Sequence, residues 1–492
     1  MFLGVDVGTF ETKGVLVDAS GAVRATAARR HRLATPQPGR VEHDAEAVWW
    51  ADVVAVTREL VGRDLGRVDA MGVSAIGPCV LPVDAELRPL RPAILYGVDT
   101  RARTQVAALE RRLGIEEVVQ RTGNRLTSQS AGPKIVWLHD EEPAIWRSAR
   151  WFHTSQSWIV SKLTGRSVID HATAGYFHPF YRLAEHRWDI SGCEDLVDLE
   201  RLPQLAWSGE VAGPLSGDAA LATGLIEGTP VIVGTTDSPA EAVGSGVLGT
   251  GELMAMYGSS SYHIRVGTDP IVDPDLWAAP FVFDGTSVLA AGTSTAGTAT
   301  RWAADLLGLH GEDDAVFGEL LALAQSVPSG SGGVMFLPHL AGERTPVQDP
   351  DSRGVLAGLG LAHGRPHVAR AVLEGIAHSV VHALSAYESA GADLTSITAV
   401  GGLTRNPVVM GAVSAMTGLD QQVAGTTGAS FGDAILAALA VGALADREAA
   451  RAWVTYRDPV AAVPDARLAD DHRDYVRLYE AMAGWHHARS GT

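Results

Sequence analysis

The segment Phe2–Asp18 constrains the fold most, because it places one acidic residue beside a Gly/Thr loop between two apolar runs. Alternating apolar residues over 2–7 predict a strand, small and hydroxyl residues over 8–12 predict a tight turn, and 14–17 predict a second strand. P-loops and dinucleotide fingerprints lead from a strand into a helix, and the Gly-Lys-Ser/Thr of a P-loop is missing from this sequence. The sequence therefore disfavours both motifs.

This predicted hairpin has the groups that bind a phosphate and its metal ion. Backbone N–H groups of Gly8 and Thr9, the hydroxyls of Thr9 and Thr12, and the ammonium of Lys13 could surround phosphate oxygens. Asp6 would face Mg²⁺ through water, since that ion keeps part of its hydration shell. An ordinary edge hairpin would show the same local pattern, so the rest of the chain has to decide between the two.

Length and charge limit the possible classes of protein. A chain of 492 residues exceeds what one hydrophobic core usually supports, so we expect two large domains. The net charge of −18 argues against a nucleic-acid partner, which would require a basic face. Two cysteines are too few for a disulfide framework, and no Cys/His spacing resembles a zinc site.

The same composition predicts the compartment. No basic segment precedes an apolar run at the amino terminus, and no apolar run reaches the roughly 18 residues of a membrane span. We therefore expect a cytoplasmic protein without a membrane or nucleic-acid partner, with a homodimer left open as the assembly.

The opening pattern returns in altered form over Pro230–Gly244, as an apolar strand, a Gly/Thr loop and Asp237, now followed by a helix. An acid with glycines and hydroxyls at the start of each half predicts two related domains that face one another across a cleft. We place the first domain at 1–246 and the second at 247–492.

Strands of the second half also end in glycine and hydroxyl loops, and helices predicted over 369–385 and 407–417 follow, which indicates an α/β domain. The three loops are Gly258-Ser259-Ser260-Ser261, Gly292-Thr293-Ser294 and Gly401 to Asn406.

With these loops in place the chain resembles, over nearly its whole length, the FGGY carbohydrate kinases, which include xylulokinases, glycerol kinases and gluconokinases. Seven ordered motifs carry the resemblance. They are Asp6-Val7-Gly8-Thr9, Arg91 to Leu95 leading to Asp99 and Arg101, Lys162 to Gly165, Gly234 to Asp237, Gly342 to Pro346, Leu373 to Ala377, and Gly401-Gly402 with Asn406.

The resemblance implies an α/β fold of two ribonuclease H-like domains, as in actin and Hsp70, around a central cleft. ATP and Mg²⁺ would bind between the domains, with the sugar deeper in the first domain and adenosine on the second. Phosphoryl transfer then depends on positioning and charge neutralisation more than on covalent chemistry.

The resemblance also implies roles for single residues. Asp237 is the expected general base toward the sugar hydroxyl, Asp6 is the acid on the metal side, and both would contact Mg²⁺ through water. Phosphate-binding residues would be Gly8, Thr9, Thr12, Lys13, Gly258, Ser259 and Ser260, and adenosine-side residues would be Gly401, Gly402 and Asn406.

The sugar-binding segments depart from the best-known relatives. Ala75-Ile76-Gly77-Pro78 stands where many xylulokinases have Gln-Met-His-Gly, and Gly97-Val98-Asp99 replaces Trp-Asn-Asp. A histidine and a stacking tryptophan are lost, while the Asp99 carboxylate could accept from two sugar hydroxyls. Expected substrate-binding residues are Gly77, Pro78, Asp99, Arg101, Gln129, Trp158 and Asp237.

The sequence thus predicts an ATP-dependent kinase for a terminal hydroxyl of a small ketose or polyol, with D-xylulose as the leading acceptor. Ribulose, a glycerol- or erythritol-type polyol and gluconate are alternatives, as is an actin- or Hsp70-like ATPase without a sugar substrate. No spare domain or low-complexity linker supports a chaperone. A dehydrogenase is disfavoured because Gly244-Ser-Gly246-Val-Leu-Gly249 follows a helix instead of a strand.

Overall fold

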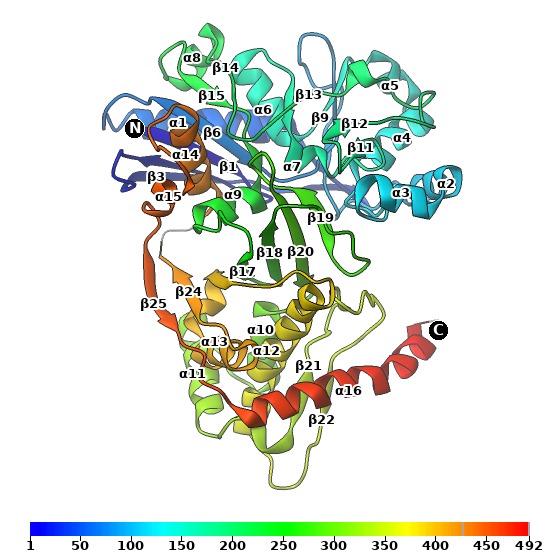
Figure 1. Cartoon of the computed structure of the whole chain (residues 1–492), viewed down its shortest axis with the longest axis vertical. Helices are drawn as coiled ribbons and strands as arrows, with labels where there is room; N and C mark the ends of the chain where they lie inside the picture. Colours follow the sequence, from blue (N-terminus) through cyan, green and yellow to red (C-terminus); the bar gives the residue numbers. More distant parts are fainter. Residues whose placement is uncertain (426–427, 491–492) are drawn as a thin grey trace.

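The computed structural model describes residues 1–425 and 428–490, which form two lobes, each built around one large sheet (Figure 1). The first sheet has the order β14-β15-β6-β1-β2-β3, and β16 also pairs with β6. Its strands are β1 Phe2–Val7, β2 Glu11–Val17, β3 Val23–Arg30, β6 Ala70–Ala75, β14 Val211–Pro214, β15 Pro230–Ile232 and β16 Thr235–Thr236.

The second sheet repeats this arrangement, with the order β19-β20-β18-β17-β23-β24-β25. In each sheet an antiparallel hairpin, β1–β2 or β17–β18, lies beside a parallel strand, β6 or β23. Two related α/β domains are therefore confirmed. The strands are β17 Glu252–Tyr257, β18 Ser261–Gly267, β19 Trp277–Pro280, β20 Ser287–Thr293, β23 Ser396–Val400, β24 Gln421–Ala424 and β25 Tyr456–Val460.

The interpretation of 230–244 as a return of the opening pattern was wrong. β15 and β16 pair with β6, so they close the first sheet, and the counterpart of the opening hairpin is β17–β18. Local composition misled the prediction, because glycines and hydroxyls gather at many strand ends while the pairing order defines the repeat.

The opening hairpin is tighter than the sequence suggested. β2 begins at Glu11, so only residues 8–10 form the turn, which the bond from Gly8 N to Glu11 O at 2.9 Å closes. Asp6 lies opposite Lys13, and Val7 lies opposite Thr12. Because side chains alternate along a strand, Asp6 and Lys13 share one face and Thr12 lies on the other.

Helices cover both sheets. Asp44 caps the first helical segment by accepting from Ala47 N at 2.9 Å. In the first domain the helices are Ala45–Trp50 (a π-helical turn), α1 Ala51–Val61, α2 Arg103–Leu113, α3 Ile115–Thr122, α4 Ala131–Glu141, α5 Pro143–Ser148, α6 Ser155–Thr164, α7 His171–Ala174, α8 Gly217–Thr223 and α9 Asp237–Gly244. Later helices are α10 Gly297–Leu306, α11 Asp313–Gln325, α12 Arg365–Ser389, α13 Pro407–Thr417, α14 Ala429–Ala440, α15 Arg447–Arg451 and α16 Ala466–Ser490.

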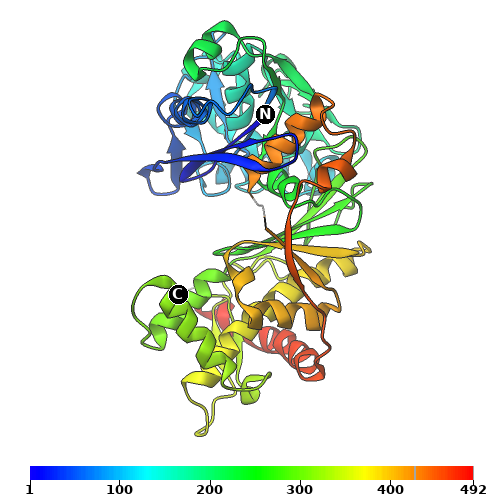
Figure 2. The ribbon, with the colours of Figure 1, turned by 90° about the vertical axis from the view of Figure 1, so that its left-hand side faces the viewer.

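One helix from the second half of the sequence belongs to the first lobe. α14 packs on β1, β6 and α9, and both views place it in the upper lobe (Figures 1 and 2). Glycines allow this contact, since a Cβ on Gly4 would lie 1.7 Å from Ser430 O and one on Gly432 would lie 1.8 Å from Ala240 O. A boundary at residue 246 therefore separates the two sheets but not all of the helices.

Among the described residues, no helix is both long and apolar enough to cross a lipid bilayer.

Candidate functional site

Asp6 stands at the end of β1 in a cluster of acidic side chains. Ser74, its parallel neighbour on β6, donates its hydroxyl to Asp6 Oδ1 at 3.2 Å. Burial, with repulsion by Asp237 and Glu241, raises the pKa of Asp6 to about 8. These carboxylates are close enough to disfavour one another's charge, so the structure brings together the two acids that the sequence singled out.

Asp237 begins α9 directly after β16. Thr235 pairs with Ser74, and Ser74 pairs with Asp6, so one strand separates the segment before Asp237 from Asp6. Ser238 donates its N–H and its hydroxyl to Asp237 Oδ1 at 2.8 and 3.2 Å. These two bonds fix Asp237 Oδ1, and Oδ2 is the oxygen that could accept a proton.

A third acid of this cluster, Glu241, was not predicted from the sequence. Glu241 lies one helical turn after Asp237, and burial followed by repulsion from Asp237 raises its pKa to about 7. The spacing of four residues, which places two side chains on one face of a helix, was the available signal.

These acids fit a hydrated Mg²⁺ ion better than a directly held one. The cluster consists of three carboxylates, those of Asp6, Asp237 and Glu241. The nearby Lys13 ammonium lowers the pKa of Asp6 and of Glu241, and a further cation would reduce the repulsion among the carboxylates. In the part of the chain that the structure describes, no three His, Cys, Asp or Glu side chains converge as direct ligands. Mg²⁺ commonly keeps several waters and uses one or two carboxylates with substrate phosphates.

Side chains of the first domain hold the predicted phosphate loop, residues 8–10, by hydrogen bonds. Thr9 Oγ1 lies 2.9 Å from the Tyr96 hydroxyl, and His31 Nε2 lies 3.0 Å from Gly8 O. Lys13 remains largely exposed, with Glu11 Oε2 at 3.4 Å. Its ammonium therefore stays on the face of the hairpin that carries Asp6.

Thr12 is not available to a phosphate in this structure. Its side chain is buried on the opposite face of the hairpin, and its hydroxyl donates to Asp52 Oδ2 at 3.2 Å. The prediction failed because the turn ends earlier than expected, which puts Thr12 within a strand and turns it toward α1.

The second predicted phosphate loop, residues 258–260, joins β17 to β18 as residues 8–10 join β1 to β2. Gly258 N donates to Ser260 O at 3.0 Å, and Ala296 N and Gly297 N donate to Ser259 O and Gly258 O. The amino end of α10 therefore lies against this loop, where its dipole favours an anion.

The Gly401-Gly402 loop lies beside it. A Cβ on Gly401, whose φ is +95°, would lie 2.5 Å from Tyr257 O, at the end of β17. Met256 and Val400 are paired, so the two loops leave the carboxyl ends of neighbouring parallel strands. The Asn406 side chain caps α13 through Val408 N and Val409 N, so the structure gives it a local role.

One sugar-side candidate, Gly77, lies against Thr236, the residue before Asp237, and Pro78 follows it in the chain. A Cβ on Gly77 would lie 2.4 Å from Thr236 Cγ2, so only glycine lets this loop approach the residue before Asp237. Gln129 contacts the neighbouring loop, where its Oε1 accepts from Gly97 N at 3.1 Å.

Asp99 and Arg101 form a buried ion pair, with Arg101 Nη2 at 2.7 Å from Asp99 Oδ2. Val41 N also donates to Asp99 Oδ2 at 2.7 Å, and Glu42 accepts from Arg101. Both Asp99 oxygens already accept bonds within the protein, so the free carboxylate expected from the sequence is not what the structure presents.

Trp158 lies in the core of the first domain. Its indole N–H donates to Leu87 O at 2.9 Å, and its ring centroid is 6.1 Å from that of Trp49. Its side chain is fully buried, so the structure assigns it to packing and gives no support for a contact with a sugar. The sequence could not distinguish these roles, because a tryptophan at a helical position fits either.

The second domain lies close enough to Asp237 for the Asp237 charge to act on Tyr262. Burial, to which the Asp237 charge adds, raises the pKa of Tyr262 on β18. Tyr176 of the first domain lies close by and stacks on Trp277 of β19, with ring centroids 5.6 Å apart. The candidate base therefore lies where the two domains meet.

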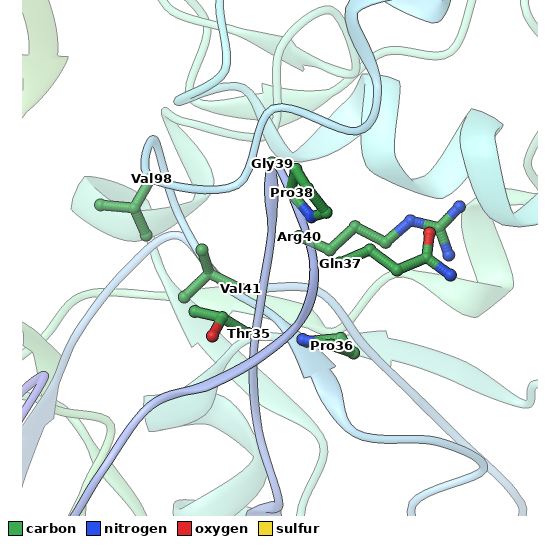
Figure 3. Close-up of a pocket in the computed structure, with 8 residues that line it drawn as sticks. All are labelled: Thr35, Pro36, Gln37, Pro38, Gly39, Arg40, Val41 and Val98. Atoms are coloured by element: carbon green, nitrogen blue, oxygen red, sulfur yellow. The ribbon is translucent and has the colours of Figure 1, made fainter.

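A shallow surface pocket lies apart from this chemistry (Figure 3). It is formed by the hairpin of β4 Ala34–Gln37 and β5 Arg40–His43 together with Val98. None of its lining residues belongs to the acidic cluster or to the predicted phosphate loops, so we do not place the reaction there.

Comparisons with known proteins agree with this geometry. Residues 1–244 match the family described as "FGGY family of carbohydrate kinases, N-terminal domain", and residues 253–441 match its C-terminal domain. The xylulose kinase of Escherichia coli is 29% identical over 89% of this chain and 90% of its own, and a glycerol kinase of Nocardia farcinica is 31% identical over 82% and 83%. The crystal structure of xylulose kinase from Rhodospirillum rubrum superposes with a TM-score of 0.91 at 28% identity, covering 99% of both chains.

Proposed function

Because the chain belongs to the FGGY family of carbohydrate kinases, we propose that it transfers the γ-phosphoryl group of ATP to a terminal hydroxyl of D-xylulose. The observation that carries the proposal is the position of Asp237, which lies in the acidic cluster of Asp6, beside the Gly77 loop, and within reach of the second domain. Relatives named as xylulose kinases support D-xylulose as the acceptor.

In this mechanism Asp237 accepts the proton of the attacking hydroxyl. Ser238 holds Asp237 Oδ1, which leaves Oδ2 to face the acceptor. General-base catalysis of this kind contributes about 10²- to 10⁴-fold in rate. The pKa of Asp237 is raised by burial, which makes the carboxylate a stronger base once it is ionised.

The remaining groups position the phosphates. The loops at 8–10 and 258–260 contribute hydroxyls and backbone N–H groups other than those of Gly8 and Gly258, which close the two turns. Lys13 adds a positive charge, and Gly401-Gly402 leave room for the adenosine. When bound near Asp6, Mg²⁺ would neutralise charge on the phosphates. Closing the domains would exclude water, which would otherwise compete with the sugar as acceptor.

A glycerol-type polyol is the second candidate acceptor. A relative named glycerol kinase is 31% identical, and the chain lacks the histidine and tryptophan that many xylulokinases place at the sugar. A smaller acceptor needs fewer side-chain contacts.

The test is Asp237→Asn, assayed for ADP release with and without D-xylulose, ribulose, glycerol, erythritol and gluconate. We expect sugar-dependent turnover to fall by about 10²-fold or more while ATP–Mg²⁺ still binds, because the amide keeps the shape but cannot accept the proton. Asp314→Asn, whose side chain is 93% exposed, is the matched control and should behave as wild type. Unchanged turnover in Asp237→Asn would remove this residue from the mechanism, and ADP release that ignores every acceptor would instead indicate a plain ATPase.

A further inference from the structure

We propose that Asp170 is a positioning residue for the reaction, because its carboxylate holds the Thr235 hydroxyl and thereby fixes the backbone that leads into Asp237. The inference rests on the proposed role of Asp237 as the general base. Asp170 lies at the end of β10 Val168–Asp170 and caps α7, on a part of the first domain for which the sequence suggested no role in the reaction.

Asp170 is fully buried and ties three segments together through one oxygen. Its Oδ2 accepts from Thr235 Oγ1 at 2.7 Å, from Ser208 Oγ at 3.0 Å and from Thr173 N at 3.3 Å. Its Oδ1 is buried without a hydrogen-bond partner among the described residues. Within the described residues, its recorded partners are two hydroxyls and one backbone N–H group.

Packing does not account for this acid. Burying a carboxyl group with an unpaired oxygen destabilises the folded state, and an apolar side chain of similar size would destabilise it less. Burial raises the pKa of Asp170 to about 6 in spite of its three donors, which reflects the same cost. We infer that the buried Asp170 carboxylate is kept because its hydrogen bonds fix the positions of Thr235, Ser208 and Thr173.

Thr235 needs such an anchor. β16 has two residues, Thr235 and Thr236, and Val233 and Gly234 separate it from β15. Gly234 has a φ of +71°, and its Cβ would lie 2.0 Å from Val73 O. So short a strand has few ladder bonds, and Asp237 follows it at once. The buried Thr235 hydroxyl donates to Asp170, and this hydrogen bond holds β16 in place.

Ser208 offers a matched control, because it donates to the same oxygen as Thr235. It lies on a separate loop, and its backbone carbonyl, which Ser208→Ala would keep, accepts from Gly234 N at 2.9 Å. Removing either hydroxyl costs Asp170 one bond, but only the bond from Thr235 connects directly to the segment of the base.

The experiment compares Thr235→Val, Thr235→Ala, Thr235→Ser and Ser208→Ala for kcat, for KM of ATP and sugar, and for melting temperature. We expect Thr235→Val and Thr235→Ala to lower kcat by roughly 10- to 100-fold with little change in KM, since a displacement of about 1 Å can cost that much. Thr235→Ser should restore kcat, and Ser208→Ala should keep it within about threefold while lowering the melting temperature as much as Thr235→Val.

Equal losses of kcat in Ser208→Ala and Thr235→Val, or no recovery in Thr235→Ser, would overturn the proposal by showing a general structural role. Wild-type kcat in both Thr235→Val and Thr235→Ala would overturn it as well. Asp237→Asn distinguishes a failure of the proposed base from a failure of the positioning role of Asp170. If it retains turnover, the proposed base and the positioning role fall together, whereas an inactive Asp237→Asn beside fully active Thr235 variants removes the positioning role alone.

Discussion

Acidic side chains dominate the chemistry of this site. Because burial shifts their pKa values, their protonation also makes the free energy of unfolding depend on pH. Asp6 has a pKa of about 8 in the folded protein, raised by burial and by the charges of Asp237 and Glu241. An unfolded chain would ionise the same group near pH 4. Between these two values the folded protein keeps a proton that the unfolded chain releases, so the free energy of unfolding falls as the pH rises from about 4 to about 8.

We therefore expect Asp6→Asn to be more stable than wild type at pH 8 in EDTA, by up to about 5 kcal/mol, with the difference shrinking toward pH 4 because the amide does not titrate. Urea unfolding at pH 5 and pH 8 measures it, with Asp314→Asn as the control for an exposed acid. Parallel pH dependences in wild type and Asp6→Asn would contradict this linkage.

Sequence analysis identified Asp6 and Asp237 because each follows an apolar strand and precedes small or hydroxyl residues. It could not find Asp433, which accepts the Ser74 N–H and hydroxyl across 359 residues of chain. Asp170 was hidden for the same reason, since its partner Thr235 is 65 residues away. Local patterns identify groups at strand ends, whereas contacts between distant segments depend on the tertiary fold.

Among the helices, the crossing of α9 and α14 depends on glycine. Gly244 of α9 and Gly432 of α14 let the two backbones touch, because a Cβ on Gly244 would lie 2.7 Å from Gly428 O. The domain on which α14 packs could not be predicted from the sequence. An apolar helix can pack on either domain, and periodicity does not say which.

We expect Gly432→Ala to destabilise the protein by about 2–4 kcal/mol, since its Cβ would lie 1.8 Å from the backbone oxygen of Ala240 and the helices would have to separate. Gly318→Ala, in an open position of α11, is the matched control and should stabilise by about 0.5–1 kcal/mol through helix propensity. Thermal and urea unfolding compare the two. Equal effects would show that the crossing tolerates separation.

Across the two domains, each of the two related sheets carries its own set of glycine and hydroxyl loops at the ends of its strands. The first set follows β1 and β6, and the second follows β17 and β23. The sequence predicted two related domains from an acid with glycines and hydroxyls at 2–18 and again at 230–244, and the strand orders show two related sheets. It misjudged which segments correspond, because strand order is a property of pairing and not of composition.

We expect the domains to close when sugar and nucleotide bind, since water beside the γ-phosphate would compete as acceptor. Small-angle scattering should show a smaller radius of gyration with D-xylulose and a non-hydrolysable ATP analogue than with either omitted. Identical curves under all conditions would count against closure, and Asp314→Asn should close as wild type does.

The position of α14 also bears on how the protein is made. During translation, residues 1–246 are synthesised long before residue 429. Until then the first sheet lacks α14, so Gly4 and Gly72 stay exposed on the face that α14 will cover. A fragment that stops at residue 246 keeps this apolar face exposed for good, which favours aggregation. Synthesis of the second domain is thus a precondition for maturation of the first.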